Sequence, residues 1–424
     1  MKIKTKHLPY EKVMSLPSRK HRAPLKPLFL LQLVVRILAI FDLFPTKFTY
    51  ETHGMEKIGK KEPCLILMNH SSFIDLKIVS KVFFPKPYGI VCTTDGFVGK
   101  GLLMRLLGCI PTQKFVTDMS LIGDMEHLLK KKRTSVLMYP EAGYSFDGTA
   151  TPLPRKMGVL LKKLNVPVVT VITHGAFARD PLYNCLQKRK VTVRADVTCL
   201  ATAEEIKQMS VSQLDELLEK AFTFDQFRYQ QEQKIAITEP FRADGLHRIL
   251  YRCPHCQAEG QMEGKGIMLT CKACGKTYTL DEYGYLTADA PAFTHIPDWY
   301  NWQREMVRQE LENGAYRLQI PVKIAMLVNT KALYVVGDGE LIHDENGFTL
   351  TGCDGKLSYT QGPLTSHTLN SDYFWYEMGD VIGIGNRDAL YYCFPKDNTP
   401  VAKARLATEE LYKIKKTKKQ PVAV

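Results

Sequence analysis

Apolar runs and helical repeats alternate between residues 62 and 200, and this alternation predicts the main domain. The short, β-branched runs are typical of buried strands, and the stretches between them repeat apolar residues every three or four positions. Strands are expected at Cys64–Met68, Tyr88–Cys92, Ser135–Tyr139, Val166–Thr173 and Lys190–Thr198, and helices at Asp75–Phe83, Leu102–Leu107, Ser120–Lys131 and Lys156–Leu164. Because strands separated by helices usually lie parallel, the pattern predicts an α/β domain over 51–245, with a mixed sheet flanked by helices.

The pattern changes after Pro291, where short strands separated by Gly and Asp turns follow an aromatic helix. Strands are expected near 316–328, 331–336, 347–351, 356–360, 373–377, 380–384 and 389–394, before a closing helix at Val401–Ile414. In element order, many strands followed by one helix resemble the pleckstrin-homology-like barrel. Residues 291–424 are therefore expected to form a smaller, mainly β domain with a terminal helix.

The first 50 residues combine a basic segment with an apolar run. Eight Lys and Arg side chains against one acid occupy the first 27 residues, and the run extends from Leu28 to Phe44. Its polar residues, Gln32, Arg36 and Asp42, share one face of roughly 120° on a helix. This arrangement predicts a membrane-association segment whose helix lies in the lipid interface behind a basic anchor. A buried core helix is the alternative.

Charge and cysteine content narrow the cellular setting. The formal net charge is +13, which favours an anionic partner, either a membrane face or nucleic acid. Eleven cysteines, an odd number, occur without a secretory signal, which indicates a reducing compartment. Together with the apolar run, these features predict that the protein associates with membrane lipids on the cytoplasmic side of the cell membrane.

Two CxxC pairs predict a metal site between the two larger domains. Cys253-Pro-His-Cys256 and Cys271-Lys-Ala-Cys274 have the spacing of a zinc ribbon over 246–290, with four thiolates closing a structural Zn²⁺ site. A redox role is the alternative. Residues 247–284 carry five basic side chains against four acidic ones, a poor footprint for phosphates. Nucleic acid is therefore disfavoured as a partner.

The segment Met68-Asn-His-Ser-Ser-Phe-Ile-Asp75 follows the first buried strand and carries the strongest catalytic signal. An imidazole at the end of a strand can take a proton from an alcohol that attacks a carbonyl, and Asp75 can orient the ring. The structural alternative is a capping box from Ser72 to Asp75. His367 and Asp372 have the same spacing in a polar loop, without a preceding strand.

Three further segments occur in a fixed order after this one: Gly108-Cys-Ile-Pro-Thr-Gln-Lys114, Tyr139-Pro-Glu-Ala-Gly-Tyr-Ser145 and Val166-Pro-Val-Val-Thr-Val171. Together the four segments resemble the blocks NHxSxxD, GxIFIxR, FPEGTRS and VPVVPV of the glycerolipid acyltransferase family, typified by 1-acyl-glycerol-3-phosphate acyltransferases. The resemblance covers roughly residues 50–200. Among the departures, Lys114, Ala142 and Tyr144 stand where the family has Arg, Gly and Arg.

The resemblance implies acyl transfer from a thioester, on coenzyme A or acyl carrier protein, to a lysophospholipid-like hydroxyl. It makes His70 the catalytic base and Asp75 its partner, and it places Lys114 at the acceptor phosphate. The residues implied in substrate binding are Asn69, Ser72, Lys114, Glu141, Gly143 and Ser145. A different class of function, a catalytically silent scaffold that docks on membranes, is kept open by the altered third block.

Overall fold

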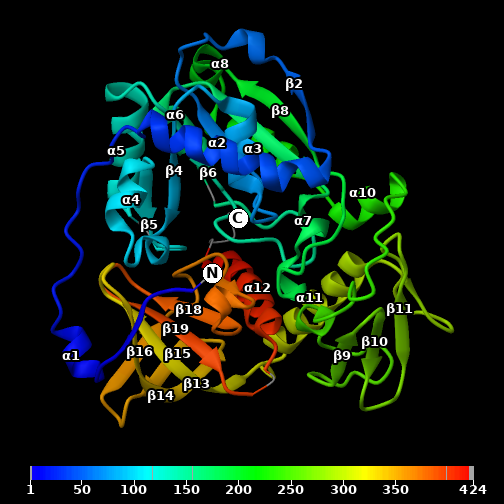
Figure 1. Ribbon diagram of the computed structural model, residues 1–424. Helices are drawn as coiled ribbons and strands as arrows, with labels where there is room; N and C mark the ends of the chain where they lie inside the picture. Colours follow the sequence, from blue (N-terminus) through cyan, green and yellow to red (C-terminus); the bar gives the residue numbers. More distant parts are fainter. Residues whose placement is uncertain (1, 117, 155, 398, 420–424) are drawn as a thin grey trace, which may run out of the picture.

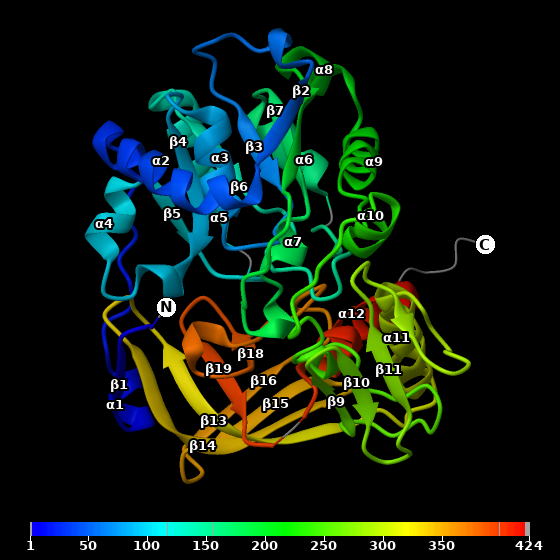
Figure 2. The same ribbon diagram turned by 45° about the vertical axis from the view of Figure 1, so that its right-hand side comes forward.

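The computed structural model describes residues 2–116, 118–154, 156–397 and 399–419. Two layers are visible in both ribbon views, an α/β layer above and an antiparallel β layer below (Figures 1 and 2). Helix α12 (Val401–Lys419) lies between the layers, and a small four-stranded sheet lies beside helix α11 (Ile296–Glu312). This arrangement brings segments from both ends of the chain to the junction of the layers.

The upper layer is built on a seven-stranded sheet. Its strands are β2 (Thr49–His53), β3 (Leu65–Met68), β4 (Tyr88–Thr93), β5 (Cys109–Thr112), β6 (Ser135–Met138), β7 (Val168–His174) and β8 (Arg194–Ala201). Their order is β2-β8-β7-β3-β6-β4-β5, with every pair parallel except β7 and β8. The predicted mixed sheet is confirmed. The sequence pattern missed β2 and β5, the two edge strands.

Alternation along β3 explains why helices cover both faces of this sheet. Ile66 and Met68 point into a core that includes residues of α2 and α3, whereas Leu65 and Leu67 point into a core with α5, α6 and α9. All four side chains are fully buried. The helices of this layer are α2 (Phe29–Leu43), α3 (Asp75–Phe83), α4 (Gly101–Leu106), α5 (Met119–Glu126), α6 (Met157–Leu164), α7 (Ala176–Arg179), α8 (Ala203–Gln208), α9 (Val211–Ala221) and α10 (Gln226–Glu232).

The lower layer is an antiparallel sheet that agrees in element order with the expected β domain. Its strands are β13 (Leu318–Leu327), β14 (Leu333–Asp344), β15 (Gly347–Gly352), β16 (Leu357–Gln361), β17 (Asn370–Asp372), β18 (Val381–Gly385) and β19 (Leu390–Pro395), ordered β16-β15-β14-β13-β19-β18-β17. The strand expected at 373–377 is wrong, because Trp375–Glu377 form a 3-10 turn. The pleckstrin-homology-like resemblance stays a prediction.

The N-terminal segment contributes to this lower sheet, which the sequence did not predict. Strand β1 (Thr5–His7) pairs in parallel with β14, and helix α1 (Tyr10–Met14) follows it. Val13 of α1 is fully buried in the same core as the β domain. The first residues therefore belong to the folded body, in addition to preceding the apolar helix.

Helix α2 turns its polar side toward the protein. Gln32 donates a hydrogen bond to the Tyr88 carbonyl (3.1 Å), and Asp42 pairs with Lys77 and Arg179. The opposite side is exposed and apolar. It carries Leu30, Val34, Ile37, Leu38, Phe41 and Phe44, each between 43% and 82% exposed. The core-helix alternative is therefore wrong, since only 22% of the apolar window Phe29–Thr46 is buried.

Candidate active site

His70 lies at the end of β3 and is held by the first turn of α3. Its Nδ1 is 3.0 Å from Oδ2 of Asp75, a carboxylate that is 1% exposed. The same oxygen accepts hydrogen bonds from the backbone N–H groups of Ser71 (3.0 Å) and Ser72 (3.1 Å). Asp75 therefore satisfies orphan N–H groups before the helix and orients the imidazole as well. Asp75 therefore combines the two roles considered for it from the sequence, binding N–H groups before the helix and holding the His70 ring.

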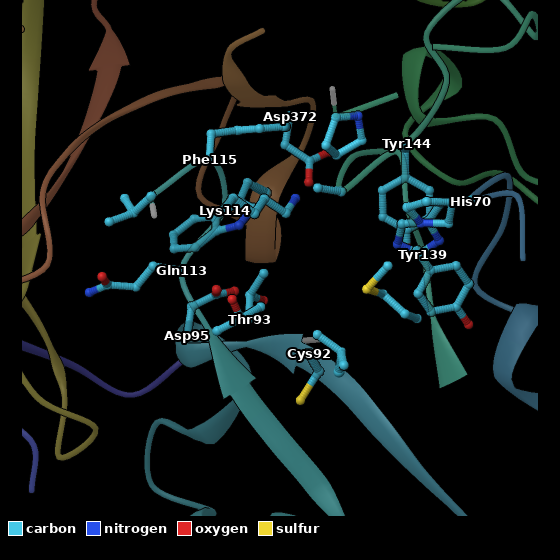
Figure 3. Close-up of a pocket in the computed structure, with 18 of the residues that line it drawn as sticks. His70, Cys92, Thr93, Asp95, Gln113, Lys114, Phe115, Tyr139, Tyr144 and Asp372 are labelled. Atoms are coloured by element: carbon cyan, nitrogen blue, oxygen red, sulfur yellow. The ribbon is translucent and has the colours of Figure 1, made fainter. Parts of the chain in front are cut away.

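Two tyrosines fix the plane of the His70 ring. The ring stacks between Tyr139 and Tyr144, with centroid separations of 4.1 Å and 3.7 Å (Figure 3). Tyr144, which replaces the family's Arg, is thus an aromatic wall of the base. Its backbone carbonyl accepts a hydrogen bond from Arg405 of α12 (3.0 Å), so the terminal helix supports this loop.

Burial sets the protonation of the His–Asp pair. It lowers the pKa of His70 well below the usual value, with a further lowering by Lys114. It raises the pKa of Asp75 to about 8, against the backbone N–H groups of Ser72 and Ser71. Because the two groups share a hydrogen bond, they titrate as one unit. Above this pKa the pair keeps one proton, at the Nδ1–Asp75 contact, and Nε2 of His70 is an unprotonated base.

A cavity of about 750 Å³ opens beside His70, at the junction of the two layers. Its upper wall comes from the ends of β3, β4 and β6 and the segments that follow them. Its lower wall comes from the β domain and includes Leu364, Asp372, Trp375, Tyr376 and Tyr412. Most of the lining is apolar or aromatic, with few charged groups, as expected of a site for a largely apolar ligand.

Of the residues expected to bind substrate, Ser72 and Lys114 line this cavity. Glu141 does not: its two oxygens accept hydrogen bonds from the His70 N–H (3.1 Å) and the Thr151 N–H (2.8 Å). Ser145 is likewise absent from the lining and donates to the Thr149 carbonyl (2.6 Å). Both are buried, which differs from the expected acceptor contact. They hold the loops that carry the base.

Asn69 and Gly143 also lie outside the cavity lining. Asn69 is fully buried, and its side-chain oxygen accepts the Thr173 N–H of the neighbouring strand β7 (2.8 Å). This bond ties the end of β3 to the sheet. Asn69 and Glu141 therefore support the position of His70 from outside the cavity lining.

Several residues that line the cavity have a strained backbone. Ala142, Phe115, Phe374, Tyr376 and Glu377 all line it and all have positive φ angles, between 48° and 64°. Such conformations are costly for residues with a side chain and persist where the surrounding structure fixes them, commonly at functional sites. The Gly-to-Ala departure of the third block falls at one of these positions, which explains why the family uses Gly there.

The lower wall contains residues that the sequence did not single out. Asp372 belongs to the His367–Asp372 spacing that lacked a strand context, yet both side chains line the cavity opposite His70. Asp95 belongs to the upper wall, just after β4, and its Oδ2 accepts a hydrogen bond from the Tyr376 hydroxyl of the lower wall (3.0 Å). The local sequence pattern did not predict that these residues lie at the site. They reach the site through the packing of two domains.

The four CxxC cysteines converge as expected of a zinc ribbon. Their sulfur atoms lie within 4.8 Å of one another, with Sγ–Sγ separations of 3.8 Å for Cys253–Cys274 and 3.7 Å for Cys256–Cys271. A tetrahedral ion with Zn–S bonds of about 2.3 Å sets sulfurs roughly 3.8 Å apart. The residues therefore fit structural Zn²⁺. The adjoining sheet comprises β9 (Met262–Lys265), β10 (Met268–Cys271), β11 (Thr277–Leu280) and β12 (Leu286–Thr287).

Taken together, an α/β sheet, a His–Asp pair at a strand end and an apolar cavity form a site at which an imidazole can accept a proton from a bound group. Comparison with known proteins identifies the domain that carries this site. Residues 49–174 match the family model described as Acyltransferase. The matched region contains the four sequence blocks, so this domain is similar to acyltransferases, in agreement with the resemblance of those blocks.

Two curated relatives are similar over the same region. A chloroplastic 1-acyl-sn-glycerol-3-phosphate acyltransferase of Brassica napus is 26% identical over 147 residues, covering 34% of this chain and 42% of that protein. The human 1-acyl-sn-glycerol-3-phosphate acyltransferase beta is 26% identical over 163 residues, covering 36% of this chain and 58% of that protein. The match thus spans about half the length of these relatives.

A crystal structure is also similar, the 1-acyl-sn-glycerophosphate acyltransferase of Thermotoga maritima. It aligns with a TM-score of 0.35 at 15% identity, over 45% of this chain and 78% of that one.

Proposed function

We propose that this protein transfers a fatty acyl group from a thioester to the hydroxyl of a lysophospholipid-like acceptor at a membrane surface. The observation that carries the proposal is the buried His70–Asp75 pair at the edge of an apolar cavity large enough for lipid chains. The thioester is carried by coenzyme A or by acyl carrier protein. The similarity to named lysophosphatidate acyltransferases supports the reaction class.

The geometry suits direct transfer. As the acceptor oxygen attacks the thioester carbonyl, its proton moves to Nε2 of His70, and Asp75 holds the Nδ1–H of the resulting imidazolium. The C–S bond then breaks, and the proton passes to the departing sulfur to give a free thiol and an ester. Each residue of the pair returns to its starting state, so no acyl group is attached to the protein.

Purified full-length protein with a radiolabelled acyl thioester and a set of lysophospholipids tests this function. The expected product is the corresponding diacyl lipid. Absence of product with every donor and acceptor, from protein that is folded and carries zinc, would favour the alternative, a silent scaffold that docks on membranes. Tyr144 in place of the family's Arg is the observation that keeps this alternative open.

The pH dependence of acyl transfer follows from the titration of the His–Asp pair. The pKa near 8 is a raised value, so the pair carries an extra proton below it and is an unprotonated base above it. We expect kcat/KM to rise about tenfold per pH unit below the pKa and to level off above it. Asp75→Asn should move this rise to lower pH, because His70 then titrates alone and burial lowers its pKa. A flat profile for the wild-type protein would contradict the assignment.

We also propose that the apolar side of α2 rests in the membrane interface. One helix in the described part of the chain is long and apolar enough to cross a membrane by length and composition. Its polar side is engaged by the α/β domain, so only the apolar side is available to lipid. Leu102 and Leu103 of α4, 71% and 47% exposed, extend this surface, since the Leu28 N–H bonds the Leu106 carbonyl (2.9 Å).

Vesicle flotation tests this orientation. A double variant, Leu38→Asp with Phe41→Asp, should lower partitioning onto vesicles containing anionic lipid by at least about 100-fold, because each side chain contributes roughly 1.5–3 kcal/mol when buried in an apolar phase. The matched control is Met268→Asp with Tyr283→Asp, two exposed apolar residues near the zinc site. Equal binding by both double variants would show that α2 is not the docking surface.

A further inference from the structure

The cavity beside His70 is lined by more acidic than basic side chains. The acidic residues of its lining are Asp75, Asp95, Asp372 and Glu377, and the basic residue is Lys114. Glu377 is exposed, so three buried carboxyl groups accompany a single ammonium group. Because Asp75 belongs to the catalytic pair, the polar groups that an acceptor meets beyond the base are mainly acidic.

Asp95 and Asp372 come from different layers and converge on Lys114. Asp95 follows β4 and is 9% exposed, and Asp372 ends β17 and is 8% exposed. One Asp372 oxygen accepts the Tyr373 N–H (3.0 Å). Burial raises the pKa of Asp372 to about 6, and of the charged neighbours Lys114 lowers it and Asp95 raises it. Figure 3 shows Lys114 between the two aspartates.

This arrangement is unsuited to a phosphate monoester. Such a group carries a charge of about −1.5 to −2 near neutral pH and needs uncompensated cations. Lys114 is already accompanied by two carboxyl groups, and Tyr144 has replaced the family's Arg. Arg405 also lowers the pKa of Asp372, but its guanidinium bonds the Tyr144 carbonyl and Glu409 and does not line the cavity. A phosphate placed here would face like charge at close range.

An acceptor group that donates hydrogen bonds is, in contrast, favoured beside these carboxyl groups. Poorly solvated carboxyl groups need donors, because an unpaired acceptor in a cavity loses its water without compensation. A hydroxyl or an ammonium group on the acceptor can donate to Asp372 and Asp95, and an ammonium group also offsets their charge. The acidic wall therefore favours such groups for the same reason that it disfavours phosphate.

We propose that Asp372 and Asp95 form a head-group subsite that selects lipid alcohols bearing a hydroxyl or ammonium group over those ending in a phosphate monoester. The proposal rests on the proposed acyl-transfer function and narrows its acceptor. It makes Asp372 a specificity-determining residue supplied by the C-terminal β domain. It also gives that domain a role at the site, as the wall that recognises the polar group of the acceptor.

Three acceptors with one acyl chain and one three-carbon backbone test the subsite. They differ at the third carbon, which carries a hydroxyl, a phosphate or a dimethylamino group, the last being protonated near neutral pH and unable to accept an acyl group itself. With full-length protein and labelled acyl-CoA, we expect kcat/KM for the hydroxyl and amino acceptors to exceed that for the phosphate by at least about tenfold. Asp372→Asn should lower kcat/KM for the amino acceptor about tenfold and raise it for the phosphate.

Asp388→Asn is the matched control, because Asp388 is exposed on the same domain and does not line the cavity. It should leave the ranking unchanged. Thermal unfolding checks the fold of Asp372→Asn, and Asp95→Asn, measured with the same acceptors, serves if that variant does not fold. A preference for the phosphate acceptor, or a ranking that neither variant alters, would overturn the subsite while acyl transfer stands. Failure to acylate any acceptor would remove the proposed function and the subsite together.

Discussion

Replacing His70 by Ala is expected to lower kcat for acyl transfer by about 10²–10⁴-fold, the usual contribution of a general base. The reason is that the variant lacks the imidazole that takes the proton of the acceptor hydroxyl. KM should change less than kcat, because the apolar walls that bind the lipid chains remain. Steady-state rates with labelled acyl thioester, at a pH above the pKa of the His–Asp pair, measure the effect.

His174→Ala provides the matched control for this experiment. His174 also lies at the end of a strand, β7, and its Nε2 is 3.1 Å from a carboxylate oxygen of Asp196. It does not line the cavity. The control should therefore keep most of the activity, although it removes a histidine of similar exposure that also pairs with an aspartate. If both variants lose activity equally, the loss reports altered folding, and if neither loses it, His70 is not the base.

Loss of a zinc ligand is expected to have the largest effect on stability. Cys271→Ser should release the ion and lower the free energy of unfolding by more than about 4 kcal/mol, because metal binding to such sites contributes directly to folding. Cys271 is fully buried in the core that also contains Trp299 of α11. The Trp299 indole donates to the Arg252 carbonyl (2.9 Å), next to the first ligand, so the damage should reach α11.

Metal analysis and thermal unfolding measure this effect together. The wild-type protein should hold one zinc per chain, and Cys271→Ser should hold much less. Cys353→Ser is the control, since Cys353 is a buried free cysteine of the β domain outside the four-sulfur cluster. It should keep the zinc and lose only a small part of its stability. A wild-type protein without zinc, or a Cys271→Ser variant as stable as the control, would contradict a structural metal.

The local part of the site was predictable from the sequence. His70 and Asp75 are five residues apart, and a strand end followed by a helix start brings them together without help from distant segments. The zinc ligands are predictable for the same reason, since each CxxC pair forms within one turn. The buried strands of the α/β layer were visible because a strand covered by helices on both faces is apolar along its whole length.

The remainder depends on contacts between distant segments. Edge strand β2 was missed because an exposed strand carries no continuous apolar run: Thr49–His53 is exposed throughout. Edge strand β5 was missed because it is only four residues long and contains Pro111. Asp372 approaches Lys114 only because the β domain packs against the α/β layer. Glu141 was assigned to the substrate from the family pattern, yet its hydrogen bonds hold the backbone of His70. Sequence spacing does not reveal which way such a side chain turns.

The central claim is that His70 removes a proton from an alcohol that attacks the thioester directly. Its most direct test counts free thiol and acylated lipid from the same reaction of full-length protein with acyl-CoA. The two products should appear in equal amounts, and thiol release should require the acceptor. A burst of thiol without acceptor would show an acyl group held on the protein, and no thiol release under any condition would show that the site is silent.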